Sequence, residues 1–254
     1  DIMKDVVSIS SAARMKGKLK RRWPLNEAQI CVKKNQKIKL ESLSDLLKSQ
    51  LNVEKFNIVE TEKESGLEQL LELKELGLPV KSTLELERKK IGPKAKQHMG
   101  KLVSTFSETD PDKIILSIQK DGKYDFKIDD EIISLDKEDF IVDFDSKENF
   151  AVAKREGFVV FISTSRNKEM MAKGLVKDIA RRLQTLRKER GYNPTDVLEV
   201  ASILELDGES LEMIKGRDEE LAFLVRVKKV NFEESCKEYK DDDIDGQKIK
   251  IAVE

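Results

Sequence analysis

The sequence NKEMMAKGLVKDIARRLQTLRKERG, residues 167–191, predicts a helix of about six or seven turns. Apolar residues recur three or four positions apart and line one helix face: Met171, Leu175, Ile179, Leu183 and Leu186. The opposite face collects the basic residues Lys173, Lys177, Arg181 and Lys188. Gly191 and then Pro194 predict the end of the helix. The basic face indicates either a solvated surface or a surface that faces phosphate groups.

The composition limits what this helix can belong to. The 254-residue chain is long enough for one large domain or about two to three small ones. Charged residues make up 38% of it, well above the usual quarter, so we expect small, separate cores. The 48 Lys and Arg nearly balance the 49 Asp and Glu, and a net charge of −1 provides no global positive field. Any binding of a polyanion must therefore come from local patches.

The apolar runs, the start of the chain and the two cysteines indicate the kind of protein and the compartment to expect. No apolar run is long enough to span a bilayer, and no signal-peptide pattern appears at the start. Because the chain begins at Asp1, inside a predicted helix, we expect it to be part of a longer protein. Cys31 and Cys236 lie far apart in apolar or mixed surroundings. We expect buried free thiols in a reducing compartment rather than a disulfide or a metal site.

The first part of the chain predicts a helical stub followed by an α+β module. The predicted helix at residues 1–20 runs into the densest positive cluster of the sequence, KGKLKRR at 16–22, and Pro24 forbids its continuation. Predicted strands lie at residues 29–33, 53–59 and 80–87, and predicted helices at 43–50 and 67–76. Gly92-Pro93 and Asp110-Pro111 each open a further predicted helix, and Gly122 ends the second.

The rest of the chain is first rich in strands and then mixed. Predicted strands lie at residues 123–128, 131–135, 140–144, 150–154 and 158–163. After the long helix we expect a strand at 197–205, a helix at 209–221, and strands at 224–230 and 248–253. The acidic run at 241–245 is interpreted as a solvated turn, and no internal repeat is evident. The predicted fold class is α+β: a helical stub followed by two or three small mixed α/β modules, with boundaries at 1–25, 26–90, 91–166 and 167–254.

The residue patterns that support catalysis are absent from the sequence. His98 is the only histidine, which is poor material for a catalytic triad. No Gly-rich phosphate loop and no zinc-binding Cys/His spacing occurs. Asp241, Asp243 and Asp245 imitate the start of a calcium loop, but Ala252 stands where the closing Glu is required. The residues therefore predict no catalysis, no cofactor and no metal for this chain alone.

Four stretches resemble archaeal and eukaryotic isoleucyl-tRNA synthetases, in the order that they have there. RWPL at residues 22–25, after AAR at 12–14, resembles the junction between the anticodon-binding helical bundle and a C-terminal extension. IGPK at 91–94 resembles a segment LGPKF, and AVA before FVVFIST, at 151–164, resembles a hairpin of the family. Residues 171–188 are similar to the family's AEGLARDVVRRIQELRKEAG, which is the long and specific match. The resemblance covers essentially the whole chain.

The resemblance implies the C-terminal region of an isoleucine–tRNA ligase, a class I aminoacyl-tRNA synthetase. Residues 1–25 would then be the end of the anticodon-binding bundle, and the ATP-using catalytic domain and the editing domain would lie upstream. The HIGH and KMSKS signatures of that catalytic domain do not occur here, so we expect no catalysis by this chain. The implied partners are isoleucine tRNA, the upstream domains of the same chain and other synthetases. The implied location is cytoplasmic, with no membrane contact.

Given the resemblance, we expect the basic cluster to contact the anticodon arm. Lys and Arg bind phosphates, and aromatic or Arg side chains stack on splayed bases. The expected tRNA-binding residues are Lys16, Lys18, Lys20, Arg21, Arg22, Trp23, Lys94, Arg181 and Arg187. Trp23 has the alternative of packing in a core, as tryptophans beside Pro at domain junctions often do. For Arg182 we expect an ion pair with Asp178, four residues earlier on the helix.

A second hypothesis comes from a different functional class. The near-neutral charge and the few aromatic residues also fit an interaction or architectural extension, without direct tRNA readout. The arrangement of the basic residues separates the two hypotheses. One contiguous basic face favours tRNA, whereas Arg21, Arg22, Lys94 and Arg181 scattered among acidic residues favour a protein partner.

Overall fold

The computed structural model describes residues 2–254 and confirms the predicted α+β class. Asp1, the first residue of the predicted N-terminal helix and module, lies outside the described residues. The described chain forms two compact units, each assembled from separate segments. Unit 1 contains residues 2–13, 29–44 and 57–162, and unit 2 contains residues 14–28, 45–56 and 163–254. The boundaries of the four predicted modules stay a prediction.

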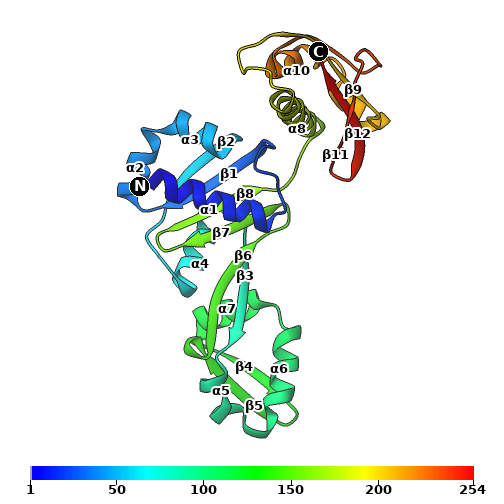
Figure 1. Cartoon of the computed structure of the whole chain (residues 1–254). Coiled ribbons are helices and arrows are strands. Elements are labelled where there is room, and N and C mark those ends of the chain that lie inside the picture. The colour runs from blue at the N-terminus through cyan, green and yellow to red at the C-terminus, as the bar shows by residue number, and fades with distance from the viewer. Residues whose placement is uncertain (1) are drawn as a thin grey trace. The chain divides into compact units, whose positions relative to one another are not determined.

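Helices and strands are mixed along the chain, with consecutive strands from β4 to β8 between α7 and α8 (Figure 1). The helices are α1 Ile2–Lys16, α2 Lys34–Glu41, α3 Ser44–Leu51, α4 Gly66–Glu75, α5 Arg88–Ala95, α6 Met99–Glu108, α7 Pro111–Asp121, α8 Lys168–Glu189, α9 Gly208–Ile214 and α10 Asp218–Val225. The strands are β1 Leu25–Val32, β2 Val53–Glu60, β3 Val80–Leu86, β4 Lys123–Ile128, β5 Glu131–Asp136, β6 Phe140–Ser146, β7 Phe150–Arg155, β8 Phe158–Ser163, β9 Leu198–Leu204, β10 Val227–Asn231, β11 Lys240–Ile244 and β12 Gln247–Val253.

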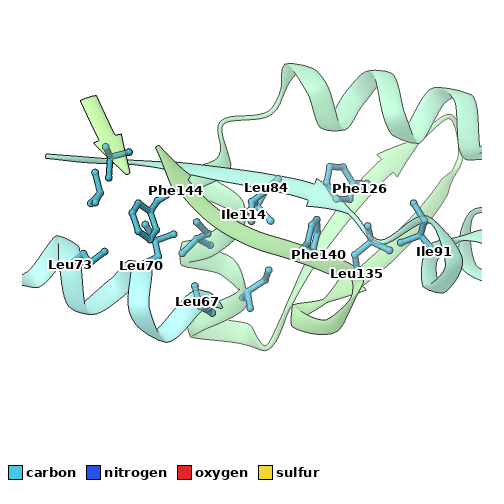
Figure 2. Packing of buried hydrophobic residues seen from close by; sticks show 14 of the residues in the cluster. Leu67, Leu70, Leu73, Leu84, Ile91, Ile114, Phe126, Leu135, Phe140 and Phe144 are labelled. Atoms are coloured by element: carbon cyan, nitrogen blue, oxygen red, sulfur yellow. The ribbon is translucent and has the colours of Figure 1, made fainter. Parts of the chain in front are cut away.

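The core of unit 1 lies around the paired strands β3 and β6. These strands are antiparallel, with Val80 opposite Ser146 at one end and Leu86 opposite Phe140 at the other. Leucines three apart on α4 share a buried cluster with Phe144 of β6 (Figure 2). The same cluster includes the buried apolar residues of α7, β4 and β5. The three-to-four spacing in α4 therefore gives the buried face that the sequence predicts.

Unit 2 contains a four-stranded sheet in the order β10-β9-β12-β11. The pairing is parallel between β10 and β9 and antiparallel for the other two pairs. Leu175, Ile179 and Leu183 of α8 are buried in one core with Ala201 of β9 and Ile251 of β12. The long helix predicted at residues 167–191 is thus confirmed, and its apolar face covers the core of this unit.

The same order of elements occurs twice, so the expectation of no internal repeat is wrong. The series α1, β1, α2, α3, β2 matches the series α8, β9, α9, α10, β10, and two further strands complete each copy. The strand order is β2-β1-β8-β7 in the first copy and β10-β9-β12-β11 in the second. Residues 61–149, which contain α4 to β6, are inserted before the last two strands of the first copy. Only residues 232–239 stand at that place in the second copy.

Backbone hydrogen bonds set the correspondence between the two copies. The amide of Leu19 donates to the carbonyl of Arg14 at 2.8 Å, and the amide of Tyr192 donates to the carbonyl of Arg187 at 3.1 Å. The amide of Leu25 donates to the carbonyl of Asn52, and the amide of Leu198 to that of Arg226, both at 3.1 Å. Arg14 therefore corresponds to Arg187, Leu25 to Leu198 and Asn52 to Arg226. Few other residue pairs are identical, which is why the sequence alone does not reveal the repeat.

Several predicted helices end or divide at other places than expected. The N-terminal helix stops at Lys16, and Lys18 adopts a left-handed backbone with φ of 53°, so the basic cluster forms a loop. Pro93 lies inside α5 rather than at a helix start, and Lys96, at φ of 45°, separates this helix from α6. Gly216, at φ of 76°, divides the predicted helix at 209–221 into α9 and α10. The sequence also missed α2, which buries only Leu40 and so lacks an apolar period.

The acidic run at residues 241–245 is a strand, and its interpretation as a solvated turn is wrong. β11 pairs with β12 so that Asp241 lies opposite Lys250 and Asp243 opposite Lys248. Alternating lysines on one strand thereby offset the charge of alternating aspartates on the other. Only Asp245 and Gly246, both with positive φ, form the turn. No helix within residues 2–254 is both long and apolar enough to cross a membrane, and no cluster there offers three metal-binding side chains.

Candidate nucleic-acid interface

A buried arginine shapes the basic loop, residues 17–22, in unit 2. The Arg14 side chain is only 4% exposed. Its Nη1 donates to the carbonyls of Lys20 and Trp23, both at 2.9 Å, and its Nη2 to those of Leu51 and Asn52 at 2.8 and 3.1 Å. Burial lowers the pKa of Arg14 to about 10, with Arg21 and Arg166 adding positive charge nearby. This guanidinium therefore fixes the loop backbone to the end of α3.

Trp23 fastens the same loop to α8. Its indole Nε1 donates to Oδ2 of Asp178 at 2.8 Å. The ring lies directly over Gly174, where an added Cβ would stand 2.4 Å from Cδ2 of the indole. Arg166 lies over the ring with its Cζ 4.9 Å from the centroid. The structure thus places Trp23 as a half-buried packing residue, which is the alternative that the sequence left open.

Asp178 is the buried anion that holds the loop. It is 1% exposed and accepts a hydrogen bond from Lys20 Nζ at 3.0 Å, and Nε of Arg22 lies 3.5 Å from its other oxygen. Burial alone would raise the pKa of this carboxyl, but the hydrogen bonds from Trp23 and Lys20 and the charge of Arg22 outweigh burial and lower the pKa. Lys20 also pairs with Asp245. Carboxylates of the protein itself therefore offset the charge of Lys20. They offset the charge of Arg22 only in part.

Asn52 links the loop to the basic face of α8. Its Nδ2 donates to the carbonyls of Arg21 and Arg22 at 3.3 and 2.9 Å, and Nζ of Lys177 lies 3.4 Å from its Oδ1. One helical turn earlier, Lys173 lies 3.2 Å from a carboxylate oxygen of Glu54. A groove of about 440 Å³ runs between these lysines and the end of α3. Backbone carbonyls and side chains together thus hold the two basic segments next to each other.

Four of the predicted tRNA-binding residues in this unit are exposed. Lys16, Lys18, Arg21 and Arg181 lie at the surface, and within residues 2–254 their charged groups bind no carboxylate. They flank the loop and α8, the two segments that Asp178 and Asn52 join. Arg22 and Lys177 stand between them, with weak contacts at 3.4 Å or longer. The basic loop and the outer face of α8 therefore form one surface, which we call the basic face.

Two predicted site residues lie elsewhere. Lys94 belongs to unit 1, where its Nζ lies 3.0 Å from Asp136 and also pairs with the buried Asp139, and the hydrogen bond to Asp139 raises the pKa of Lys94. Arg187 is 5% exposed, and its guanidinium donates to four backbone carbonyls, those of Val225, Arg226, Asn193 and Asp196. Of the four residues chosen to separate the hypotheses, Arg21, Arg22 and Arg181 share the basic face and Lys94 does not.

The expected ion pair between Asp178 and Arg182 is not formed. The Asp178 carboxylate is taken by the loop, and Arg182 instead reaches Asp242 at 3.4 Å and the carbonyl of Asp243 at 2.7 Å. Sequence reasoning also missed Arg14 and Asn52, the two residues that fix the loop backbone. Arg14 follows Val6, Ile9 and Ala13, the repeating apolar residues of the predicted helix. An arginine at the end of such a face was the available signal, since a buried guanidinium needs acceptors.

Comparison with known proteins shows what the chain is similar to. No family model matches it. The isoleucine–tRNA ligase of Archaeoglobus fulgidus is 27% identical over 258 residues, which cover 99% of this chain. That of Methanocella arvoryzae is 26% identical over 263 residues and covers 100% of it, and that of Clostridium kluyveri is 27% identical and covers 98%. The chain is homologous to a segment of isoleucine–tRNA ligases.

The homology confirms the resemblance drawn from the four sequence stretches, and it extends over the whole chain. The chain spans 22% of the length of these three relatives. The homology therefore relates the chain to one segment of these ligases, and the role of the chain is inferred from the geometry of the basic face.

Proposed function

We propose that this chain is the C-terminal tRNA-binding region of an isoleucine–tRNA ligase and that its basic face contacts the anticodon arm of isoleucine tRNA. In this proposal the chain performs no chemistry. It positions the tRNA for a reaction that other parts of the ligase carry out with ATP in the cytoplasm. Binding energy at a remote site of this kind raises kcat/KM by placing the substrate.

The repeat supplies the observation that carries the proposal. The loop after Arg187 has the same backbone hydrogen bonds as the basic loop, yet Asn193, Pro194 and Thr195 stand where the basic loop has Lys20, Arg21 and Arg22. The fold can therefore be built without this positive charge. Asp178 and Asp245 offset the charge of Lys20, and Asp178 offsets part of that of Arg22, but Lys18 and Arg21 pair with no carboxylate in the described chain. Like charges held close together cost free energy by self-repulsion, so a ligand of opposite charge accounts for these two residues.

The contacts suggest a division of labour among the predicted residues. Lys16, Lys18, Arg21 and Arg181 are exposed and are assigned to phosphates, with Arg22 and Lys177 between them. Trp23 and Lys20 are engaged by Asp178, so we assign them to holding the loop in place. Arg187 and Lys94 are engaged by other groups and have no part in the proposal. Phosphate contacts of this kind give affinity and orientation, and they depend strongly on salt.

The proposal is tested by fluorescence anisotropy with labelled isoleucine tRNA, using the intact chain and the variant Lys18→Gln/Arg21→Gln. Both side chains are exposed and make no ion pair in the described chain, so the fold should be unchanged. Loss of two phosphate contacts should weaken binding roughly tenfold near 0.1 M salt and reduce the slope of log K against log salt by about two. The affinity for a non-cognate tRNA is measured in parallel. Weaker binding of that tRNA would indicate recognition of the isoleucine anticodon arm, and equal binding would indicate recognition of charge alone.

The matched control is Lys215→Gln/Lys229→Gln, which removes the same charge from exposed positions of the second copy. This variant should bind as the intact chain does. Equal weakening by both variants would reduce the effect to net charge and refute the basic face. Absence of binding by the intact chain at 50 mM salt would refute the proposal for this segment.

A further inference from the structure

The two copies differ in whether a helix lies against one corresponding face. In the first copy α8 lies along the face at the start of β1 and the end of α3, which we call the covered face. Lys173 of α8 is 3.2 Å from Glu54, Lys177 is 3.4 Å from Asn52, and Gly174 packs under Trp23. All of these residues belong to unit 2.

The corresponding face of the second copy, which we call the bare face, has no helix on it within residues 2–254. The register of the copies places Val197 at the position of Pro24, Phe223 at Ser49, Arg226 at Asn52 and Lys228 at Glu54. Val197 is 60% exposed and Phe223 is 82% exposed, whereas Pro24 is buried. Val197 thus stands open where Pro24 is buried, and Phe223 stands open at the position of Ser49, an exposed residue that lines the groove between α3 and α8.

Relative to the covered face, the bare face has one charge reversed from negative to positive and one positive charge added. Glu54, which faces Lys173, is replaced by Lys228, and the neutral Asn52, which faces Lys177, is replaced by Arg226. Lys228 is 62% exposed, and within residues 2–254 its one ion pair is with Glu199, which is itself 72% exposed. A helix in the place of α8 would need acidic residues where α8 has Lys173 and Lys177, that is, four residues apart. It would also gain apolar contact with Val197 and Phe223.

We propose that the bare face of Val197, Phe223, Arg226 and Lys228 binds an amphipathic helix of a partner protein. The helix presents two acidic residues at positions i and i+4, and apolar residues beside them cover Phe223. Recognition of one helix face by apolar anchors at such spacings is a common mode of peptide binding. The repeat supports this occupant because the same fold already holds a helix at the corresponding place. This binding is independent of tRNA, since the bare face includes no residue of the basic face.

The test uses two labelled peptides with the sequence of residues 167–186, one unchanged and one carrying K173E and K177E. Fluorescence anisotropy measures the binding of each peptide to the intact chain. The acidic peptide should bind, and the unchanged basic peptide should bind at least tenfold more weakly because Lys228 and Arg226 repel it. Phe223→Ser should weaken binding of the acidic peptide at least tenfold, and Lys228→Glu should shift the preference toward the basic peptide. Both side chains are exposed, so these variants should fold.

The control variant is Leu116→Ser, which removes an apolar side chain that is 64% exposed on α7 of unit 1. It should leave the affinity for the acidic peptide unchanged. Equal affinity for both peptides, or binding that Phe223→Ser does not weaken, would overturn the proposal. Sedimentation of the intact chain adds a further outcome: a dimer that Phe223→Ser dissociates would show that a second copy covers the face, and a partner helix would then be refuted.

Discussion

The loop after Arg14 and the loop after Arg187 share a backbone and differ in chemistry. In each copy the arginine donates to carbonyls six and nine residues ahead and to two consecutive carbonyls at the end of a helix. The receiving helix is α3 in the first copy and α10 in the second. The residue after each helix, Asn52 or Arg226, has a left-handed backbone, with φ of 51° and 57°.

The difference shows which residues build the fold and which are added to it. A planar guanidinium offers several donors in a fixed arrangement, so one side chain can satisfy the orphan carbonyls of a helix end and a loop together. Once the backbone is fixed in this way, the side chains of the loop are free to differ. The first copy has Lys18, Arg21 and Arg22 there, and the second has Gly191, Pro194 and Thr195.

The largest effect is expected from removing either arginine. Arg14→Met and Arg187→Met each leave buried carbonyls without donors, which should cost about 3 kcal/mol of local stability. Amide hydrogen exchange reports each copy separately. Exchange should accelerate at Leu25 in the first variant and at Leu198 in the second, because each amide donates to the carbonyl just past the clamped helix.

Exposed Arg181 provides the comparison for this experiment. Arg181→Met should leave exchange at both amides unchanged, since its side chain binds no carbonyl in the described chain. If Arg14→Met accelerates exchange at Leu25 and Leu198 alike, the two arginines do not stabilise their copies separately. The matching hydrogen bonds of Arg14 and Arg187 would then not represent two independent contributions to stability.

Elements with a clear period could be predicted from the sequence, and those defined by long-range partners could not. The alternation of Leu175, Ile179 and Leu183 with basic residues predicts α8 correctly. The strand β11 was missed because its acidic residues gain their stability from Lys248 and Lys250 on another strand. The repeat was missed because its conserved content is hydrogen bonding by the backbone, which few identical residues record.

A second, smaller effect should follow from Gly174→Ala. The new Cβ would stand 2.4 Å from the indole of Trp23, so the ring must move, at a cost of about 1–3 kcal/mol. Trp23 is the only tryptophan, so its fluorescence emission reports the displacement directly. The basic loop should loosen with it, whereas the loop after Arg187 has no tryptophan and should keep its hydrogen exchange rates.

Gly100→Ala is the matched substitution, because Gly100 also lies in a helix and a Cβ there would meet no atom within 4 Å. It should leave the emission of Trp23 unchanged. An unchanged emission in Gly174→Ala as well would mean that the indole does not pack on α8 in solution. The loop would then lack the anchor that distinguishes it from its counterpart.

The sequence predicted where the basic residues of the site lie. It did not predict which of them are available to a ligand. KGKLKRR identified the basic loop, and Lys16, Lys18 and Arg21 are exposed as a phosphate contact requires. Whether a basic side chain is available depends on carboxylates and carbonyls that lie far away in the sequence. Asp178, more than 150 positions later, decides the use of Lys20 and Trp23. The two buried arginines differ from the exposed ones only in partners that the sequence does not show.

The smallest effect is expected from Glu54→Gln, at the carboxylate that faces Lys173. This pair is well exposed, at 34% for Lys173 and 46% for Glu54, so its loss should change stability by less than about 0.5 kcal/mol. The same change leaves Lys173 paired only with Glu169 in the described chain, at 3.1 Å, and removes one negative charge from beside the basic face. Binding of isoleucine tRNA should therefore become roughly two- to threefold tighter, with a slightly steeper dependence on salt.

Glu199→Gln is the corresponding control in the second copy. Glu199 pairs with Lys228, and Lys228 is the residue that occupies the position of Glu54 in that copy. It alters net charge equally but lies away from the basic face, so tRNA affinity should stay the same. If Glu199→Gln tightens binding as much as Glu54→Gln does, only the overall charge matters to the tRNA. The contrast between the basic loop and its neutral counterpart would then have no bearing on recognition, because both copies would attract RNA equally.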